Sequence, residues 1–595
     1  MSEPSSRLPS AMIRYLPLAY WLKDYQRDDF VSDLIAGIVV GILLIPQGMA
    51  YAFLAGLPPE YGLYAAIVPL FIYALLGSSR SLAVGPVAIA SLMVGSTIAD
   101  ATARGLGDPV NIAINLSLLV GVILICLRIL RLGSIVNFMS HSVISGFTSA
   151  AALLIGVSQL RHLTGLSIPN DGFITDSFGF LLQHLSSINV VTLFLGLLGL
   201  LILWFAKARL ANLLSRTALP NWLIQPICRA GPMFAMIVGT LLVASPGLDQ
   251  HYQVAIIGSI PEGLPSLQLI SIDLQLWQQL LTPAILIALI GFLESVSVGT
   301  TLASRERERI EPNKELIALG MANLGAAFSG TYPVAGGFGR SMVNFASGAR
   351  TTIASLIAAV MVAVTVSFLT PLFYYLPKAI LGAVIIMAVL PLMDIRAFTD
   401  SWKFNKADAL TMFITFIAVL TLGVEIGILC GIAISFLLFI YRSSQPHIAV
   451  VGRVGESQHF RNVARHEVTT DEHILAIRVD ESLYFANTRF VEDFIRSQCA
   501  SRREVEHVIM ICNAVNFIDA SALESLENLT VQLASEGVTL HLAEVKGPIM
   551  DRLQKTSFLQ QLSPGQVFFT ADEAMRTLMQ TGDSETSASS IERHQ

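Results

Sequence analysis

Long runs of apolar residues alternate with short polar segments from about residue 31 to residue 441. A run of about 20 apolar residues can cross the ~30 Å hydrocarbon core of a bilayer as a helix. The pattern predicts spans at about 31–50, 61–77, 80–99, 110–130, 137–160, 187–207 and 231–247, then at about 281–303, 315–330, 339–349, 351–370, 378–393 and 406–441. The last stretch is long enough for two spans separated at Gly423 and Glu425, so the pattern predicts seven spans in each half. Pro46 is expected to interrupt the first span near one end.

The pattern changes after Arg442 to shorter apolar segments that alternate with polar ones. Strands are predicted over 473–479, 482–487, 505–514, 538–545 and 567–570, and helices over 488–500, 521–537, about 548–558 and about 571–580. This alternation predicts a small α/β layer fold. The expected organisation is a cytoplasmic lead-in (1–30), a polytopic α-helical transmembrane domain (31–442), a soluble domain (443–580) and a disordered tail (581–595).

Two of the predicted spans are broken by glycine or proline. In residues 331–350, Gly336, Gly337 and Gly339 predict an extended or irregular segment over 331–338, followed by a short helix that begins near Gly339 or Arg340. In residues 80–93, an extended LAVG segment precedes a helix that Pro86 is expected to open at a first-turn position. A pair of broken helices, one in each half, indicates the binding site of a transporter. Helix N-termini favour anions, and Arg340 adds a full positive charge, so a small anion is the expected cargo.

The composition excludes several other classes of protein. With 53% hydrophobic and 13% charged residues, the chain is not an ordinary soluble protein. The net charge of −6 and the absence of a long basic run argue against nucleic acid as a partner. Five scattered cysteines show no metal or redox spacing, so no metal and no cofactor is expected. The soluble part has no phosphate-binding glycine loop and no nucleophile elbow, and the chain is predicted not to be an enzyme.

Basic residues in the loops predict the orientation of the chain. With a cytoplasmic N-terminus, the inside loops contain Arg128, Arg131, Lys207, Arg209, Arg216, Arg229, Arg305, Arg307, Arg309, Lys314, Arg396, Lys403, Lys406 and Arg442. The outside loops contain only Arg104, Arg161 and Lys378. This bias obeys the positive-inside rule and predicts that both termini are cytoplasmic. No cleavable signal precedes the first span, and a multi-pass protein of the inner (plasma) membrane is expected.

Three motifs carry a resemblance to a known family: LLIPQGMAYAFLAGLPPEYGLY at 43–64, GSSRSLAVGPVAIASLM at 77–93 and NFIDASAL at 516–523. Over about 14–580 the chain resembles the sulfate permease (SulP) family of anion transporters, and its soluble part resembles a STAS domain. The resemblance implies a seven-plus-seven inverted repeat with two broken half-helices, divided into core and gate bundles. It implies substrate contacts from Gln47 and Tyr51 on the first span, from Val84, Gly85, Pro86, Val87 and Ala88 on the first broken element, and from Gly339, Arg340 and Ser341 on the second.

Two residues have alternative interpretations. Arg340 either binds the anion or caps a helix end or pairs within the bundle; the cost of a charge in a span favours binding. Glu294 lies in an otherwise uncharged span and is either a buried, hydrogen-bonded carboxyl, a counter-ion to Arg340, or a carrier of the coupling ion. In the family, an acidic residue in this span resembles the position for the coupling proton or sodium ion, which favours the carrier.

The remaining polar residues have less specific patterns. Glu425 is expected to pair structurally or to stabilise a helix N-terminus. Gln47 and Tyr51 lie one helical turn apart and are expected to face the same side. Asn323, Asn344 and Ser341 either line the site or make ordinary interhelical hydrogen bonds. Related STAS domains carry a phosphorylatable serine near the sequence Asp-Ser-Ser-Gly. The corresponding stretch here is Asp519-Ala520-Ser521-Ala522, which departs from that sequence but makes Ser521 the candidate regulatory phosphosite.

Together these features predict a secondary active transporter of an inorganic oxyanion, with sulfate–proton symport as the favoured activity. Backbone N–H groups around Val87 and Ser341 are expected to bind the anion oxygens. The alternatives are a sodium-coupled bicarbonate or dicarboxylate transporter of the same family, an anion channel, and a sensor. The expected partners are the anion, a coupling proton or sodium ion, membrane lipid and a second copy of the chain, because the soluble domain is expected to regulate and stabilise a homodimer.

Overall fold

The computed structural model describes residues 17–134, 140–167, 174–217, 224, 227–244, 247–268, 270 and 273–580. The predicted tail 581–595, the first part of the predicted lead-in and the first residues of the span predicted at 137–160 lie outside these ranges. The chain divides into two units, residues 1–435 and 436–595.

Each predicted span contains a helix. The first half holds α3 (Arg27–Leu54), α4 (Pro59–Tyr64) with α5 (Val68–Leu76), α6 (Ala88–Ala103), α7 (Pro109–Ile129), α8 (His141–Ser158) with α9 (Leu160–Thr164), α11 (Val190–Ala208) and α14 (Gly231–Ala244). The second half holds α16 (Leu274–Arg305), α17 (Pro312–Phe328), α18 (Phe338–Ala346), α19 (Ile353–Phe368), α20 (Lys378–Val389), α22 (Lys406–Leu422) and α23 (Val424–Ser444). In the described ranges, eight helical segments are long and apolar enough to cross a membrane, and α6, α14 and α19 are shorter apolar helices.

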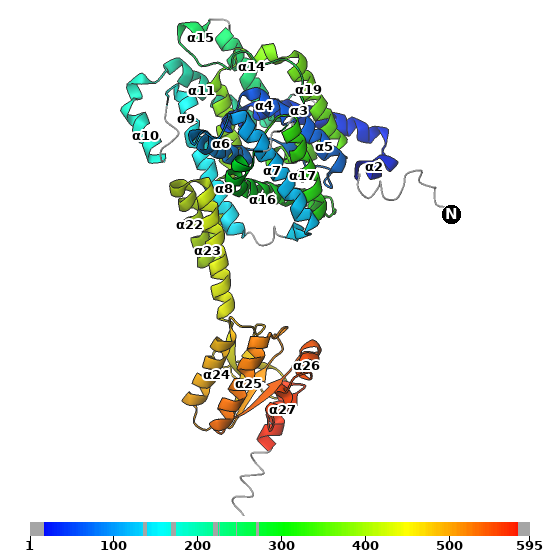
Figure 1. Ribbon diagram of the computed structural model, residues 1–595, viewed down its shortest axis with the longest axis vertical. Coiled ribbons are helices and arrows are strands. Elements are labelled where there is room, and N and C mark those ends of the chain that lie inside the picture. Colours follow the sequence, from blue (N-terminus) through cyan, green and yellow to red (C-terminus); the bar gives the residue numbers. More distant parts are fainter. Residues whose placement is uncertain are drawn as a thin grey trace, which may run out of the picture. The chain divides into compact units, whose positions relative to one another are not determined.

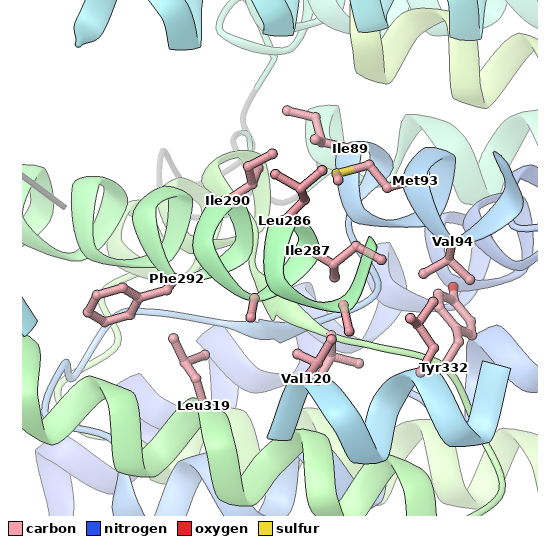
Figure 2. Close-up of a cluster of buried hydrophobic side chains, with 14 of the residues drawn as sticks. Ile89, Met93, Val94, Val120, Leu286, Ile287, Ile290, Phe292, Leu319 and Tyr332 are labelled. Atoms are coloured by element: carbon pink, nitrogen blue, oxygen red, sulfur yellow. The ribbon is translucent and has the colours of Figure 1, made fainter. Parts of the chain in front are cut away.

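The contacts between these helices group most of them into two bundles, and Figure 1 shows α7 beside α16 and α17, and α8 beside α22. In the first bundle, α7 packs on α16 and α17, α5 packs on α17 and α19, and α3 packs on α6, α18 and α19. In the second bundle, α8 packs on α22, and α20 packs on α9, α11 and α14; both α14 and α20 also contact α3 of the first bundle. Figure 2 shows part of the core of the first bundle, where Leu286 and Ile290 of α16 point toward Ile89 and Met93 of α6. The two broken elements α6 and α18 thus belong to the first bundle.

Three predicted helix boundaries were wrong. The helix α3 continues through Pro46 to Leu54, because buried neighbours on α4 and α19 hold it although Pro46 donates no hydrogen bond. The helix α16 begins at Leu274 rather than near 281, because Asp273 caps it by accepting bonds from the N–H groups of Gln275 and Leu276. The helix α6 begins at Ala88, so Pro86 precedes the helix instead of opening it.

The second unit contains a six-stranded sheet in the order β4-β3-β5-β6-β7-β8. Its strands are β3 (Ile448–Arg453), β4 (Phe460–Asn462), β5 (Ile474–Val479), β6 (His507–Ile511), β7 (Thr539–Ala543) and β8 (Val567–Phe568). The strands β5 to β8 run parallel, and β3 is antiparallel to both of its neighbours. The helices α24 (Thr488–Ser501), α25 (Ala520–Ser535), α26 (Gly547–Leu553) and α27 (Phe558–Gln561) bury one face, and the helix at 571–580 buries the other.

The structure also corrects three predictions for this unit. The strand predicted over 482–487 is a turn, because Asn487 accepts a bond from the N–H of Tyr484 and donates one to the carbonyl of Ser482. Only Leu483 in this stretch forms a bridge, with Ile518. The strands β3 and β4 were not predicted, and the helix predicted at 548–558 is instead the two short helices α26 and α27.

Candidate functional site

The two broken elements meet as a short antiparallel pair of strands. The strand β1 (Val84–Gly85) pairs with β2 (Ala335–Gly336), with Val84 opposite Gly336 and Gly85 opposite Ala335. The helices α6 and α18 begin directly after these strands, with the extended residues Val87 and Gly337 as their N-caps. The first N–H groups of a helix have no partner inside it and form its positive end. The pairing therefore brings two positive helix ends, and their free N–H donors, to one place in the first bundle.

Arg340 is a buried cation at this place, on the first turn of α18. Its side chain is 2% exposed, and Nη1 donates a hydrogen bond to the carbonyl oxygen of Pro86. Its Nε and Nη2 are buried without a hydrogen-bond partner. A Cβ atom on Gly337 would lie 3.1 Å from Nη2, and one on Gly85, where φ is +156°, would lie 3.6 Å from it. The glycines thus leave space for a guanidinium that still has hydrogen-bond donors to offer.

Ser341 joins the two broken elements and is not free to bind a ligand. Its Oγ accepts a bond from the N–H of Ala83 at 3.0 Å and donates one to the carbonyl of Gly337 at 2.7 Å. Its own N–H donates to the same carbonyl of Gly337 at 3.0 Å. The N–H of Ser341, expected to bind the anion, is therefore already used. The first-turn N–H groups that precede it, from Phe338 to Arg340, have no partner within α18.

Neighbouring helices satisfy the irregular backbone around the site. Ser295 of α16 accepts a bond from the N–H of Gly336 at 2.8 Å. Asn323 of α17 bonds both the N–H and the carbonyl of Val334, and Asn344 of α18 donates to the carbonyl of Ser81. Unsatisfied backbone groups are costly inside a membrane, so these residues stabilise the broken segments. Asn323 and Ser341 thus make structural hydrogen bonds, and so does the amide nitrogen of Asn344, whose Oδ1 is buried without a partner.

Glu294 of α16 lines a cavity beside the two helix N-termini. The cavity has a volume of about 190 Å³, and it is also lined by Ile89 and Phe338 from the first turns of α6 and α18. The other lining residues are mostly apolar: Val143, Ile144, Phe147, Thr148, Ile290, Leu293, Ser297, Val298, Leu392 and Ile428. Oε2 of Glu294 is buried without a partner. Glu294 lies within electrostatic range of Arg340, but they form no ion pair.

The two candidate residues of α3 lie in different surroundings. Tyr51 is 7% exposed and within electrostatic range of both Arg340 and Glu294. Gln47 lines another cavity of about 140 Å³, between α3 and helices of the second bundle, where its neighbours include Leu203 and Val384. Arg340 does not line that cavity. The structure therefore brings Tyr51, and not Gln47, toward the helix N-termini.

Ser521 belongs to the second unit and is exposed on the first turn of α25. Asp519 caps this helix by accepting a bond from the N–H of Ala522 at 2.8 Å, and it also accepts one from the N–H of Phe485.

Glu425, expected to have a structural role, lies on the first turn of α23 and accepts a bond from the hydroxyl of Thr97 at 3.1 Å.

Two buried carboxylates that support the first bundle were missed from the sequence. Asp33 of α3 accepts bonds from the N–H groups of Arg350 and Thr351 and from the hydroxyls of Tyr25 and Thr351. Glu315 of α17 accepts bonds from the hydroxyl of Tyr73 and from both the N–H and the hydroxyl of Ser78. Both are 0% exposed. An acidic residue close to the predicted start of an apolar span was the available signal for each.

Comparisons with known proteins agree with this architecture. The sulfate permease family model matches residues 30–415, and the STAS domain model matches residues 465–574. The probable sulfate transporter 4.2 of Arabidopsis thaliana is 33% identical, covering 94% of this chain and 83% of the relative. The chloroplastic sulfate transporter 4.1 of the same plant is 34% identical, covering 95% and 82%. High affinity sulfate transporter 1 of Stylosanthes hamata is 30% identical, covering 94% and 85%.

Solved structures share the fold. Murine SLC26A9 in the inward-facing state superposes with a TM-score of 0.86 at 23% identity, covering 97% of this chain and 96% of that one. The transmembrane domain of the cyanobacterial bicarbonate transporter BicA gives a TM-score of 0.58 at 24% identity, covering 68% and 98%. The predicted fold class, a helical inverted-repeat membrane domain followed by a STAS domain, is confirmed.

Proposed function

The chain belongs to the sulfate permease family, as a multi-pass membrane protein with a C-terminal STAS domain, and from this premise we propose that it is a sulfate–proton symporter. Anion transport follows from the family, whereas the identity of the anion and of the coupling ion is our proposal. Sulfate is favoured because the relatives compared above are sulfate transporters. We also infer that the chain is a transporter and not an enzyme.

The observation that carries the proposal is the guanidinium of Arg340 between the two helix N-termini. Its Nε and Nη2 are buried donors without a partner, and each donor that stays unpaired in a buried place is costly. An arginine fork can bind two oxygens of one oxyanion, which an ammonium cannot do with the same geometry. Sulfate would accept these bonds together with bonds from the first-turn N–H groups of α6 and α18. Gly85, Pro86, Val87, Ala88 and Gly339 would shape the site through their backbone.

Glu294 is the proposed proton carrier. A dianion that enters beside an ionised Glu294 meets a negative charge in a cavity with mostly apolar walls. Because Coulomb interactions are strong where water is scarce, protonation of Glu294 would favour entry of the anion. Loss of the proton on the other side would favour its release. Sulfate and protons would in this way cross the membrane together, without an ion pair between Glu294 and Arg340.

The two bundles supply the movement. We expect the first bundle to carry the site relative to the second, so that the site opens to one side of the membrane at a time. In the proposed setting the protein lies in the plasma membrane with both termini in the cytoplasm. The STAS domain would regulate and stabilise a homodimer, with Ser521 as a phosphorylation site that is exposed for a kinase.

The experiment that tests the proposal is uptake of radiolabelled sulfate into liposomes, with and without an inward proton gradient, at fixed sodium. Accumulation above equilibrium that requires the proton gradient is expected. Sulfate that only equilibrates would indicate a channel. No flux of sulfate in a preparation that moves bicarbonate with sodium would overturn both the proposed substrate and the proposed coupling ion.

A further inference from the structure

Phe53, near the end of α3, connects the two bundles on the side predicted to face outward. Its ring packs edge to face against His162 of α9, with 5.1 Å between ring centroids and 74° between ring planes. Lys378, the first residue of α20, places its Nζ 5.2 Å from the centre of the same ring. Phe53 belongs to the first bundle, whereas His162 and Lys378 belong to the second. A separation of the bundles on this side must therefore break both contacts.

Within the described ranges, the cluster holds two cations without an acidic partner. Arg161 donates from Nε to Nε2 of His162 at 3.1 Å, so this ring nitrogen carries no proton and the ring is uncharged. Among the described residues, no ion pair includes Arg161 or Lys378. Arg104, the third basic residue predicted outside, is instead paired with Asp100 at 2.8 Å. Arg161 and Lys378, which have no ion pair in the described part of the chain, are thus both linked to Phe53, Lys378 directly and Arg161 through His162.

The position of Lys378 increases the positive potential there. Lys378 is the first residue of a 12-residue helix, where the N–H groups already form a positive end. A cation at that end is unfavourable, and both Lys378 and Arg161 are partly shielded from water. Such a concentration of uncompensated charge attracts anions and raises their local concentration.

The basic cluster lies at the outer end of an apolar contact between the two bundles, and this contact extends to the candidate site. One apolar cluster joins Ile380 and Leu381, which follow Lys378 on α20, to Tyr51 of α3 and to Ala88, the first residue of α6. The basic cluster and the N-terminus of α6 therefore lie along a continuous contact between the two bundles. In this conformation Phe53 lies over Lys378 and beside His162 at the outer part of that contact.

We propose that Arg161 and Lys378 form an outer capture site for the transported oxyanion, which Phe53 covers in this conformation. The proposed capture site rests on the proposed function, because it assumes that an oxyanion enters from outside. When the bundles part on this side, Lys378 exchanges the face of an aromatic ring for an anionic ligand. The anion is then held by two cations at the entrance before it reaches Arg340.

A kinetic experiment compares Arg161→Gln, Lys378→Gln and the double variant with Arg104→Gln as the matched control. The external KM is measured at low and at high salt, with sulfate first and otherwise with the oxyanion that the wild type carries. We expect the KM to rise about threefold in each single variant and about tenfold in the double variant, with little change in maximal rate, because electrostatic attraction acts on encounter. The increase should shrink at high salt. An unchanged KM, or an equal increase in Arg104→Gln, overturns the capture site.

A second experiment needs no transport. In a variant that lacks the native cysteines, Lys378→Cys is treated with membrane-impermeant thiol reagents that are either anionic or neutral. The positive charge of Arg161 should make the anionic reagent react about threefold faster relative to the neutral one, and Arg161→Gln should remove this preference. Arg104→Gln should keep it. Equal relative rates with and without Arg161 contradict the capture site, whereas a wild type that moves no sulfate overturns the proposed function alone.

Discussion

The hydroxyl of Ser341 accepts a hydrogen bond from the backbone N–H of Ala83 at 3.0 Å, and this bond joins two segments that are more than half the membrane domain apart in the chain. Ala83 and Ser341 are both 0% exposed, so water cannot replace the bond. The same hydroxyl donates to the carbonyl of Gly337, the N-cap of α18. This buried hydroxyl therefore adds to the pairing of β1 and β2 in fixing the relative position of the two helix N-termini.

The variant Ser341→Ala is expected to destabilise the membrane domain by about 1–3 kcal/mol, because it leaves the N–H of Ala83 buried and unsatisfied. Sulfate affinity should fall with stability, since one of the bonds that align the two helix ends is lost. Thermal unfolding in detergent, with and without sulfate, measures both effects. Ser304→Ala, whose exposed hydroxyl bonds only within its own helix end, serves as the control and should leave both unchanged.

Replacement of Arg340 tests the proposed anion site directly. Arg340→Gln should weaken sulfate binding by about tenfold to a hundredfold, because a hydrogen bond to a charged group contributes about 1.5–3 kcal/mol. Arg340→Lys keeps the charge and should retain part of the affinity while losing the two-oxygen geometry. Binding of radiolabelled sulfate to the purified protein gives the dissociation constants. Affinity equal to wild type in Arg340→Gln would place the anion elsewhere, and the exposed Arg350→Gln is the control for surface charge.

The variant Glu294→Gln separates proton coupling from anion binding. It cannot lose a proton, so an inward pH step should no longer drive accumulation of sulfate, although sulfate should still bind and exchange. The matched control is Glu425→Gln, which alters a partly buried carboxyl bonded to Thr97 and should keep coupling. Sulfate uptake after a pH step, compared with sulfate exchange at equal pH, provides the readout. Accumulation by Glu294→Gln in response to the pH step would exclude Glu294 as the carrier.

Two substitutions of Asp33 are expected to lower the stability of the membrane domain by different amounts. Asp33→Ala removes four hydrogen bonds and should lower stability by about 3 kcal/mol or more. Asp33→Asn can keep the geometry, because its amide oxygen accepts from the N–H groups of Arg350 and Thr351 and its NH₂ donates to the hydroxyls of Tyr25 and Thr351. It should therefore cost only about 1 kcal/mol. Unfolding temperatures in detergent test this order, with the exposed Asp28→Asn as control. Equal losses in Ala and Asn would show that charge, not bonding geometry, dominates.

The stability of the STAS domain should fall in mild acid. Burial and the neighbouring His507 lower the pKa of His541 to about 4, from an ordinary value of 6.5. Between pH 6.5 and pH 4 the folded state thus binds fewer protons than the unfolded state. The contribution of the neutral His541 to stability is therefore fully present above about pH 6.5 and is lost as the pH falls toward 4. Calorimetry of the STAS transition in the full-length protein from pH 7.5 to 4.5 measures the slope. His541→Asn should flatten it, and an unchanged slope would assign the effect to other groups.

Much of the membrane domain could be predicted from the sequence because its signals are local. The span predicted at 406–441 is split at Gly423, where φ is +89°, into α22 and α23. The glycines before Arg340 predicted a broken helix, and α18 begins at Phe338, within two residues of the expected start. Glycine has no Cβ atom, and apolar length must match the bilayer, so neither feature needs knowledge of distant contacts.

The contacts between distant segments were decided only by the tertiary structure. The sequence could not show that Ser341 bonds Ala83, that Gln47 lines a cavity that Arg340 does not reach, or that α3 continues through Pro46. Nor could it show that Lys378 and His162, the hydrogen-bond partner of Arg161, both pack against Phe53. Hydropathy and helix breakers record the preference of each segment for lipid or water, whereas the partner of a buried polar group depends on which helices pack together. The sequence alone therefore determined the spans, the two breaks and the charge at the second break, and packing determined which groups remained free to bind an anion.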